Sequence, residues 1–147
     1  MQPLVKSVST TQALNSSVFV GSYQLSSIVL WVSDMDTQSR FYAELFNVAN
    51  VETRNGFAQV GDGANSVLLH QLPLEYRAQT PLNEALTAQT EVAIKPIFRV
   101  SSIQETTERI QHSFAKISGE VLNHGEFNYL DVIDPEGNVI QICEQVH

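Results

Sequence analysis

One order of elements occurs twice along the chain, and this duplication restricts the possible folds more than any other feature of the sequence. In the first half, a β-rich segment bounded by "SDMD" predicts a strand over 25–32, and apolar residues at helical spacing predict a helix over 35–48. Three short strands follow, over 49–53, 56–62 and 66–72, separated by Gly and Asn residues typical of turns. This half is therefore predicted to be strand–helix–three strands.

The second half repeats the order. A strand is predicted over 92–100, and the pair Ser102 and Glu105 forms a capping box that predicts the start of a helix. Three further strands are predicted over 119–124, 127–134 and 138–145. Two copies make a duplicated unit rather than a solenoid, because a solenoid needs at least three repeats.

Each predicted helix has one apolar face that we expect to be buried. In the first helix this face consists of Phe41, Tyr42, Leu45 and Phe46. In the second helix it consists of Ile103, Ile110, Phe114 and Ile117.

The length of 147 residues suits one compact domain, which we expect to span residues 18–147. Within it the two repeated modules cover about 24–72 and 92–146. They are joined by a connector over 73–91, in which Thr80–Pro81 is expected to open a short helix. Residues 1–17 are polar and rich in Ser, Thr and Gln, and are predicted to form a flexible N-terminal arm.

Charge and composition exclude several classes of function. A net charge of −8 argues against nucleic acid as a partner, because phosphate binding needs a basic surface. The single cysteine, Cys143, excludes an internal disulfide and any site with several cysteine ligands, and we expect it to be a small buried packing residue. The sequence shows neither a signal-peptide core nor an apolar run of membrane-spanning length, so a cytoplasmic protein without membrane partners is predicted.

The duplicated order, together with "IVLWVSDMDTQSRFY" at the first strand–helix junction and "DVIDPEGNVIQI" at the last hairpin, resembles the vicinal oxygen chelate superfamily. This superfamily contains glyoxalases, extradiol dioxygenases and bleomycin-resistance proteins, and the resemblance covers roughly residues 24–146. It implies an α+β fold of two βαβββ modules whose sheets curl around a shared cavity. Asp134, Pro135, Gly137 and Asn138 supply the tight turn of the hairpin, and we assign them no chemical role.

Strand alternation predicts which side chains face the cavity. The side chains expected to face inward and bind a ligand are Trp31, Lys95, Arg99, Tyr129, Asp131 and Gln141, with Phe57 and Ile97 completing the wall. His70 joins them if Val67 and Leu69 pack into the core, whereas a slip of one residue would turn it away.

The resemblance also implies positions for metal ligands: a His or Gln near the start of the first strand of each module, and a Glu in the last strand of each. Three of these positions hold Ser27, Lys95 and Gln141, and the fourth falls near His70. Serine is a poor ligand for a divalent cation, and a protonated lysine repels one. We therefore predict no metal site and no cofactor.

Two functions follow as hypotheses. The first is metal-independent binding of a small organic molecule in the cavity, as in the bleomycin-resistance branch that this chain resembles. The alternative is an enzyme, a lyase, isomerase or dioxygenase of the superfamily with a non-standard site, in which His70, Lys95 or Asp131 would act as acid or base. The pair Lys95 and Arg99 predicts an anionic ligand, and the open sheet edges predict a homodimer.

Overall fold

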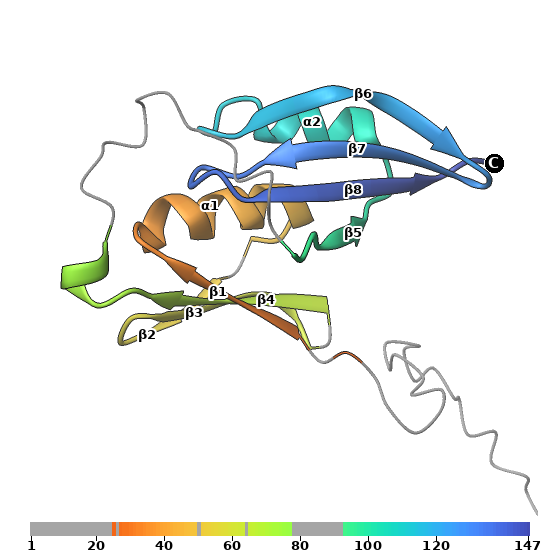
Figure 1. Cartoon of the computed structure of the whole chain (residues 1–147). Helices are drawn as coiled ribbons and strands as arrows, with labels where there is room; N and C mark the ends of the chain where they lie inside the picture. Colours follow the sequence, from red (N-terminus) through yellow and green to blue (C-terminus); the bar gives the residue numbers. More distant parts are fainter. Residues whose placement is uncertain (1–24, 26, 50, 64, 78–92) are drawn as a thin grey trace, which may run out of the picture.

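Each half of the chain folds into one helix packed on one four-stranded sheet (Figure 1). A computed structural model describes residues 25, 27–49, 51–63, 65–77 and 93–147. The predicted arm over 1–17 and the helix expected at Thr80–Pro81 lie outside these residues. The described elements form two βαβββ units, so the predicted α+β fold class is confirmed.

The first unit contains β1 (Ser27–Val32), α1 (Met35–Phe46), β2 (Val51–Arg54), β3 (Phe57–Asp62) and β4 (Asn65–Gln71). A short 3-10 helix, η1 (Leu74–Tyr76), follows it. The second unit contains β5 (Ile97–Arg99), α2 (Ile103–Ile110), β6 (Lys116–His124), β7 (Phe127–Ile133) and β8 (Val139–Gln145).

The two sheets share one topology. The strand orders are β1-β4-β3-β2 and β5-β8-β7-β6. In each sheet the first strand of the unit runs parallel to the last, and the remaining pairs are antiparallel. The duplication in the sequence therefore corresponds to a duplication in space.

The largest differences from the predicted bounds are in α2 and β5, which are shorter than predicted, and in β6, which begins at Lys116 rather than at residue 119. α2 ends at Ile110 because Ser113 donates both its backbone N–H and its hydroxyl to the Ile110 carbonyl, at 3.0 and 2.6 Å, which closes a turn. Phe114 therefore lies beyond the helix and is 50% exposed, and Ile117 belongs to β6; their assignment to the buried helix face was wrong, and Thr106 is buried there instead.

β5 contains three residues and is shorter than the strand predicted over 92–100. Pro96 precedes it and has no N–H to donate, and it restricts the backbone of Lys95. The Pro96 carbonyl still accepts from the Gln141 amide at 2.9 Å, so the strand remains in register with β8.

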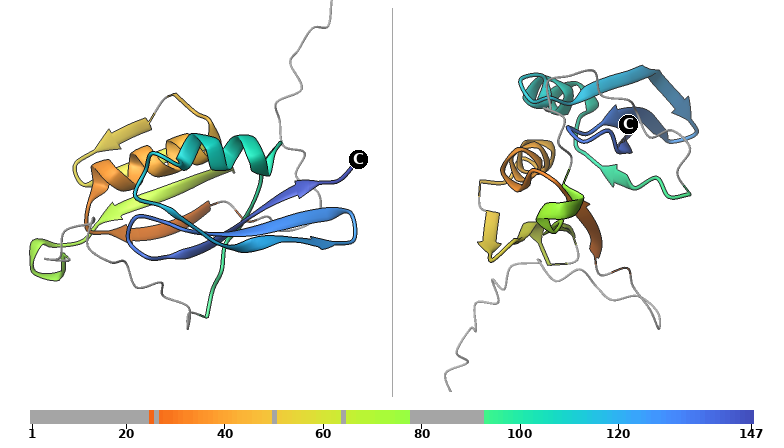
Figure 2. Two further views of the ribbon diagram at one scale, coloured as in Figure 1. Left: turned by 90° about the horizontal axis from the view of Figure 1, so that it is seen from above. Right: turned by 60° about the vertical axis from the view of Figure 1, so that its left-hand side comes forward.

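The helix of one module lies beside the helix of the other, and the two helices contact each other (Figure 2). Phe46 of α1 meets Phe98 of β5 edge to face, with ring centroids 5.1 Å apart. A single cluster of buried apolar side chains extends through both modules, from Val32 and Phe41 to Ile110 and Ile142. The two modules thus share one hydrophobic core.

A buried polar network also joins the modules at the last hairpin. Asp134 is fully buried, and its carboxylate accepts from the Tyr42 hydroxyl at 3.0 Å and from Gln38 Nε2 at 3.1 Å, both on α1. Glu136, two residues further on, accepts from the backbone N–H groups of Ser33 and Asp34 at the start of the same helix. The turn residues predicted to be fold punctuation therefore also hold the first module to the second.

Local capping explains where α1 begins and ends. Asp34 is the N-cap residue, and its side chain accepts from the Thr37 N–H at 3.0 Å. Asn47 ends the helix in the left-handed conformation with φ of 55°. None of the helices that the structure describes is both long and apolar enough to cross a membrane.

The buried contact of Tyr42 with Asp134 predicts that the free energy of unfolding decreases at alkaline pH. Burial, and then the neighbouring Asp134 carboxylate, raises the Tyr42 pKa well above the ordinary value of 10.0. The unfolded chain releases this proton near pH 10 while the folded protein still holds it, so the contribution of Tyr42 to stability is lost as pH rises above 10. We expect Tyr42→Phe to lower the free energy of unfolding by about 1–2 kcal/mol at pH 8, and to differ less from the parent as pH rises above 10.

Urea denaturation at pH 8, 10 and 11 measures both effects. Tyr76→Phe is the matched control, because Tyr76 is 69% exposed. A difference between parent and Tyr42→Phe that stays constant over this pH range would contradict the assignment.

Candidate functional site

A row of three polar side chains crosses the open face of the second sheet, on the side away from α2. Lys95 Nζ lies 2.8 Å from Asp131 Oδ2, and Gln141 Nε2 donates to Asp131 Oδ1 at 2.8 Å. Asp131 and Gln141 are register partners on β7 and β8, and Gln141 is in turn the partner of Ile97 on β5. Strand alternation thus brings together three of the residues predicted from the sequence.

Arg99 lies two residues further along β5 on the same face. Its guanidinium carbon stands 4.7 Å from the centre of the Phe127 ring, and the Phe127 and Tyr129 rings are 6.3 Å apart. Among the described residues, the one ion pair is that of Lys95 with Asp131, so Arg99 has no carboxylate partner there. A cation is therefore held over an aromatic ring, with its charge uncompensated by a neighbouring carboxylate.

An aromatic cluster occupies the open face of the first sheet. The His70 ring lies edge-on to Trp31, with centroids 4.5 Å apart, and to Phe57 at 5.6 Å. Val67 and Leu69 are buried, so the predicted strand register is the observed one and His70 shares the face of Trp31. His70 Nδ1 is enclosed without a hydrogen-bond partner in the part of the chain described, so the ring is held by packing.

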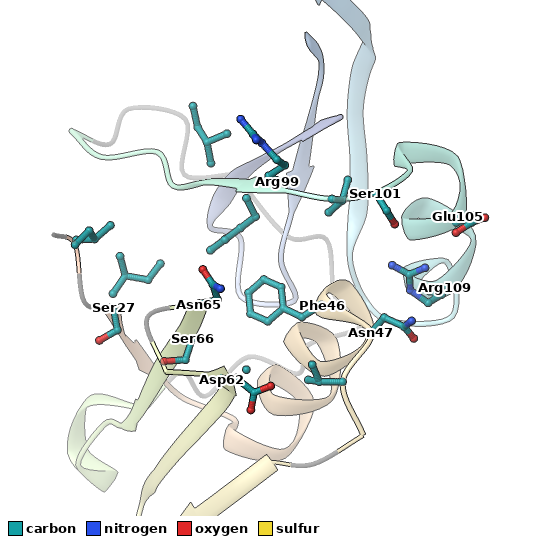
Figure 3. Close-up of a pocket in the computed structure, with 17 residues that line it drawn as sticks. Ser27, Phe46, Asn47, Asp62, Asn65, Ser66, Arg99, Ser101, Glu105 and Arg109 are labelled. Atoms are coloured by element: carbon teal, nitrogen blue, oxygen red, sulfur yellow. The ribbon is translucent and has the colours of Figure 1, made fainter. Parts of the chain in front are cut away.

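The predicted site residues therefore fall into two groups on two sheets, Trp31 and His70 on the first and the other five on the second. Between the modules lies a cleft of about 980 Å³. It is bordered by the starts of β1 and β4, the ends of β3 and α1, β5, and Glu105 and Arg109 of α2. Figure 3 shows Phe46 near its centre, with Arg99 and Ser101 on one side and Asp62, Asn65 and Ser66 on the other. Of the seven predicted site residues, Arg99 is the one that borders this cleft.

Sequence reasoning did not identify Arg109 at the cleft. Its Nε donates to the Glu44 carbonyl at 3.0 Å and its NH2 group donates to Thr106 Oγ1 at 3.0 Å. Arg109 thus ties α2 to the last turn of α1, where unpaired carbonyls favour a cation. A basic residue in the last turn of a short helix was the available signal, but its partner is 65 residues away along the chain.

Phe127 was also missed, although it stands at the start of β7 on the open face and supports Arg99. The alternation of that strand places Phe127 on the same side as Tyr129 and Asp131. This was the signal that could have found it.

The side chains at the positions expected for metal ligands do not fit a divalent cation. The Lys95 ammonium and the Gln141 amide already engage both Asp131 oxygens, and His70 belongs to the other sheet, between two aromatic rings. Among residues 25, 27–49, 51–63, 65–77 and 93–147, no three His, Cys, Asp or Glu side chains converge where they could hold a metal ion. These four positions therefore do not form a site for a divalent metal ion.

Comparison with known proteins places the fold. No protein-family model matches the sequence. The Salmonella typhimurium virulence protein STM3117 is 29% identical over 123 residues, which cover 81% of this chain and 82% of that protein. Its crystal structure matches with a TM-score of 0.59 over 86% of this chain and all of that chain, at 23% identity.

Two further solved structures carry more informative names. A glyoxalase family protein from Bacillus cereus matches with a TM-score of 0.61 and 18% identity, over 90% of this chain and 100% of its own. A glyoxalase/bleomycin resistance protein from Albidiferax ferrireducens matches with a TM-score of 0.60 and 13% identity, over 82% and 97%. The chain has the glyoxalase-like, vicinal oxygen chelate fold, and the resemblance seen in the sequence is confirmed at the level of the fold.

The edge-to-face contact between Trp31 and His70 predicts an energetic coupling between the two side chains. We expect a double-mutant cycle of Trp31→Ala and His70→Ala to give a coupling free energy of about 0.5–1.5 kcal/mol, because aromatic pairs of this geometry stabilise a fold beyond the area they bury. Urea denaturation at pH 8 measures it.

His124→Ala is the control partner for Trp31→Ala in a second cycle, because His124 lies in the exposed end of β6. A coupling of Trp31 with His70 that is no larger than its coupling with His124 would show that His70 does not face Trp31 in solution.

Proposed function

We propose that this protein binds a small organic acid with an apolar body on the open face of the second sheet, without a metal ion. Arg99 holds the carboxylate, and the body lies against Ile97 and the adjoining cleft. The observation that carries the proposal is the Arg99 guanidinium, which has no carboxylate partner among the described residues, beside the Lys95–Asp131 ion pair. In the same proposal the protein is cytoplasmic.

The balance of charge on the face supports an anion. Lys95 and Asp131 form an ion pair and cancel, so Arg99 leaves one net positive charge among the three. Covering that charge with an apolar or cationic ligand would remove its water without replacement, which is costly. A carboxylate replaces the lost water with paired charge-assisted hydrogen bonds to the planar guanidinium.

The surroundings of Arg99 supply the apolar contacts. Ile97 is 55% exposed on the edge strand β5, and the Phe127 ring contacts the Arg99 guanidinium. The cleft beside β5 is walled in part by Phe46, Val48 and Phe98, and its size falls within the range of small-molecule sites. An acid of roughly 10–15 heavy atoms has room to lie across β5.

The names of the similar structures are compatible with two classes of function. A bleomycin-resistance name points to binding, whereas a glyoxalase name points to an enzyme of the superfamily. The side chains at the expected ligand positions favour binding, because Lys95 brings an ammonium group to one of them.

A matched ligand series tests the sign of the ligand charge. We expect 4-ethylbenzoate to raise the melting temperature by about 5 °C at a hundredfold excess over its Kd, and the corresponding amide and benzylamine to give little shift. Arg99→Ala should weaken acid binding at least tenfold, because it removes charge-assisted hydrogen bonds. Differential scanning fluorimetry and calorimetry provide the readouts.

Arg40→Ala is the control for that series, because Arg40 is exposed on α1. Binding should also be unchanged in EDTA, and protein purified without chelator should contain less than stoichiometric metal. If the amine stabilises best, or if Arg99→Ala binds the acid as tightly as the parent, the proposal is wrong; stoichiometric metal would favour the enzyme.

We also propose that two copies associate through the open sheet faces. Both faces carry large apolar side chains in water, Trp31 at 57% and Val29 at 51% on the first and Leu122 at 68% on the second. The aromatic cluster of the first face can pack against the exposed Ile97 and Leu122 of the second face, so the first face of one copy suits the second face of another.

Light scattering is expected to give twice the chain mass of 16.3 kDa at micromolar concentration. Trp31→Glu should shift the protein to the monomer, whereas Leu74→Glu, at a still more exposed apolar residue in η1, should not. A monomeric parent would contradict the association.

A further inference from the structure

The Gln141 amide is turned by its neighbour, and this determines which of its atoms a ligand meets. The Asp131 carboxylate accepts from Lys95 at one oxygen and from Gln141 Nε2 at the other, both at 2.8 Å. A carboxylate has no hydrogen to donate, so only the NH2 side of the amide can face it. The Gln141 Oε1 atom must therefore point away from Asp131.

The outward Oε1 atom is available as an acceptor. Gln141 is half-buried in the centre of β8, and no side chain or backbone group in the described part of the chain donates to Oε1. In the described part of the chain, the enclosed side-chain atoms without a hydrogen-bond partner belong to Gln38, Ser39, Glu44 and His70. Gln141 Oε1 is therefore open to solvent. A ligand that lies on Ile97, the β5 partner of Gln141, would displace this water.

We propose that Gln141 selects ligands carrying an O–H or N–H donor in addition to the acid group. This inference rests on the proposed function, since it assumes that the carboxylate lies at Arg99. Arg99 and Gln141 are diagonal neighbours on adjacent strands, so their Cα atoms are separated by roughly 7–8 Å. The ligand class is therefore an acid with a hydroxyl or amide N–H several bonds from the carboxylate, across an apolar spacer.

The same chain of hydrogen bonds predicts a variant that inverts the selection. In Asp131→Asn, Lys95 can only donate, so it takes the Asn oxygen and turns the Asn NH2 group toward Gln141. Gln141 then turns its oxygen inward and presents its NH2 group to the ligand. The single change from acid to amide at Asp131 converts an acceptor on the open face into a donor.

The test compares 4-(hydroxymethyl)benzoate with its methyl ether, 4-(methoxymethyl)benzoate, by calorimetry. The parent should bind the alcohol about five- to tenfold more tightly than the ether, because only the alcohol donates to Oε1. In Asp131→Asn this ratio should fall to one or below. Arg99→Ala should weaken the binding of both ligands and leave the ratio of their affinities unchanged. The control is Gln111→Leu, at an exposed glutamine next to α2, which should change neither the affinities nor their ratio.

The outcomes separate this inference from the proposed function. A ratio that is the same in the parent and in Asp131→Asn, with binding still dependent on Arg99, would overturn the role of Gln141 alone. Failure of the parent to bind either acid would overturn both. A ratio that falls in Asp131→Asn and not in Gln111→Leu supports the inference.

Discussion

The arrangement of the two modules depends on the hydrogen bonds that the buried Asp134 carboxylate accepts. It lies in the last hairpin of the second module and accepts from Tyr42 and Gln38 on the helix of the first. A buried carboxylate needs hydrogen-bond donors, and Tyr42 and Gln38 add two donors from α1 to the three that the turn itself supplies. Glu136 adds the two backbone N–H groups that precede the same helix, so the start of α1 is held by the other module.

This contact determines which surfaces remain open. Because α1 meets the hairpin and α2 on one side, both helices are used in covering the shared core. The sheet faces away from the helices are left exposed, with an aromatic cluster on one and a polar row beside Arg99 on the other. The two faces differ in chemistry although the modules share a topology, so the duplication has been retained in the backbone and lost in the side chains.

Much of this organisation is accessible to sequence reasoning, because strand alternation is a geometric property of the backbone. It correctly grouped Lys95, Asp131 and Gln141, and it gave the right register for His70 once Val67 and Leu69 were assigned to the core. Local capping by Asp34 was equally predictable, since its partner is three residues away. These features depend on neighbours in the chain or on a period of two.

Contacts between the modules were not predictable in the same way. Asp134 looks like an ordinary turn residue until Tyr42, 92 positions earlier, is placed against it. The cleft depends on how two modules pack, and Arg109 is positioned at it by the Glu44 carbonyl, 65 residues away along the chain. The early end of α2 turns on one serine that competes for a carbonyl, which periodicity cannot detect.

The claim that the second sheet carries the ligand site can be tested most directly by backbone amide NMR during a titration with 4-ethylbenzoate. We expect chemical-shift changes concentrated in β5, β7 and β8 around Arg99 and Gln141, with a coupled change at the Arg99 Nε–H resonance. Changes confined to β1, β3 and β4 around Trp31 and His70, with the Arg99 resonance unmoved, would contradict it.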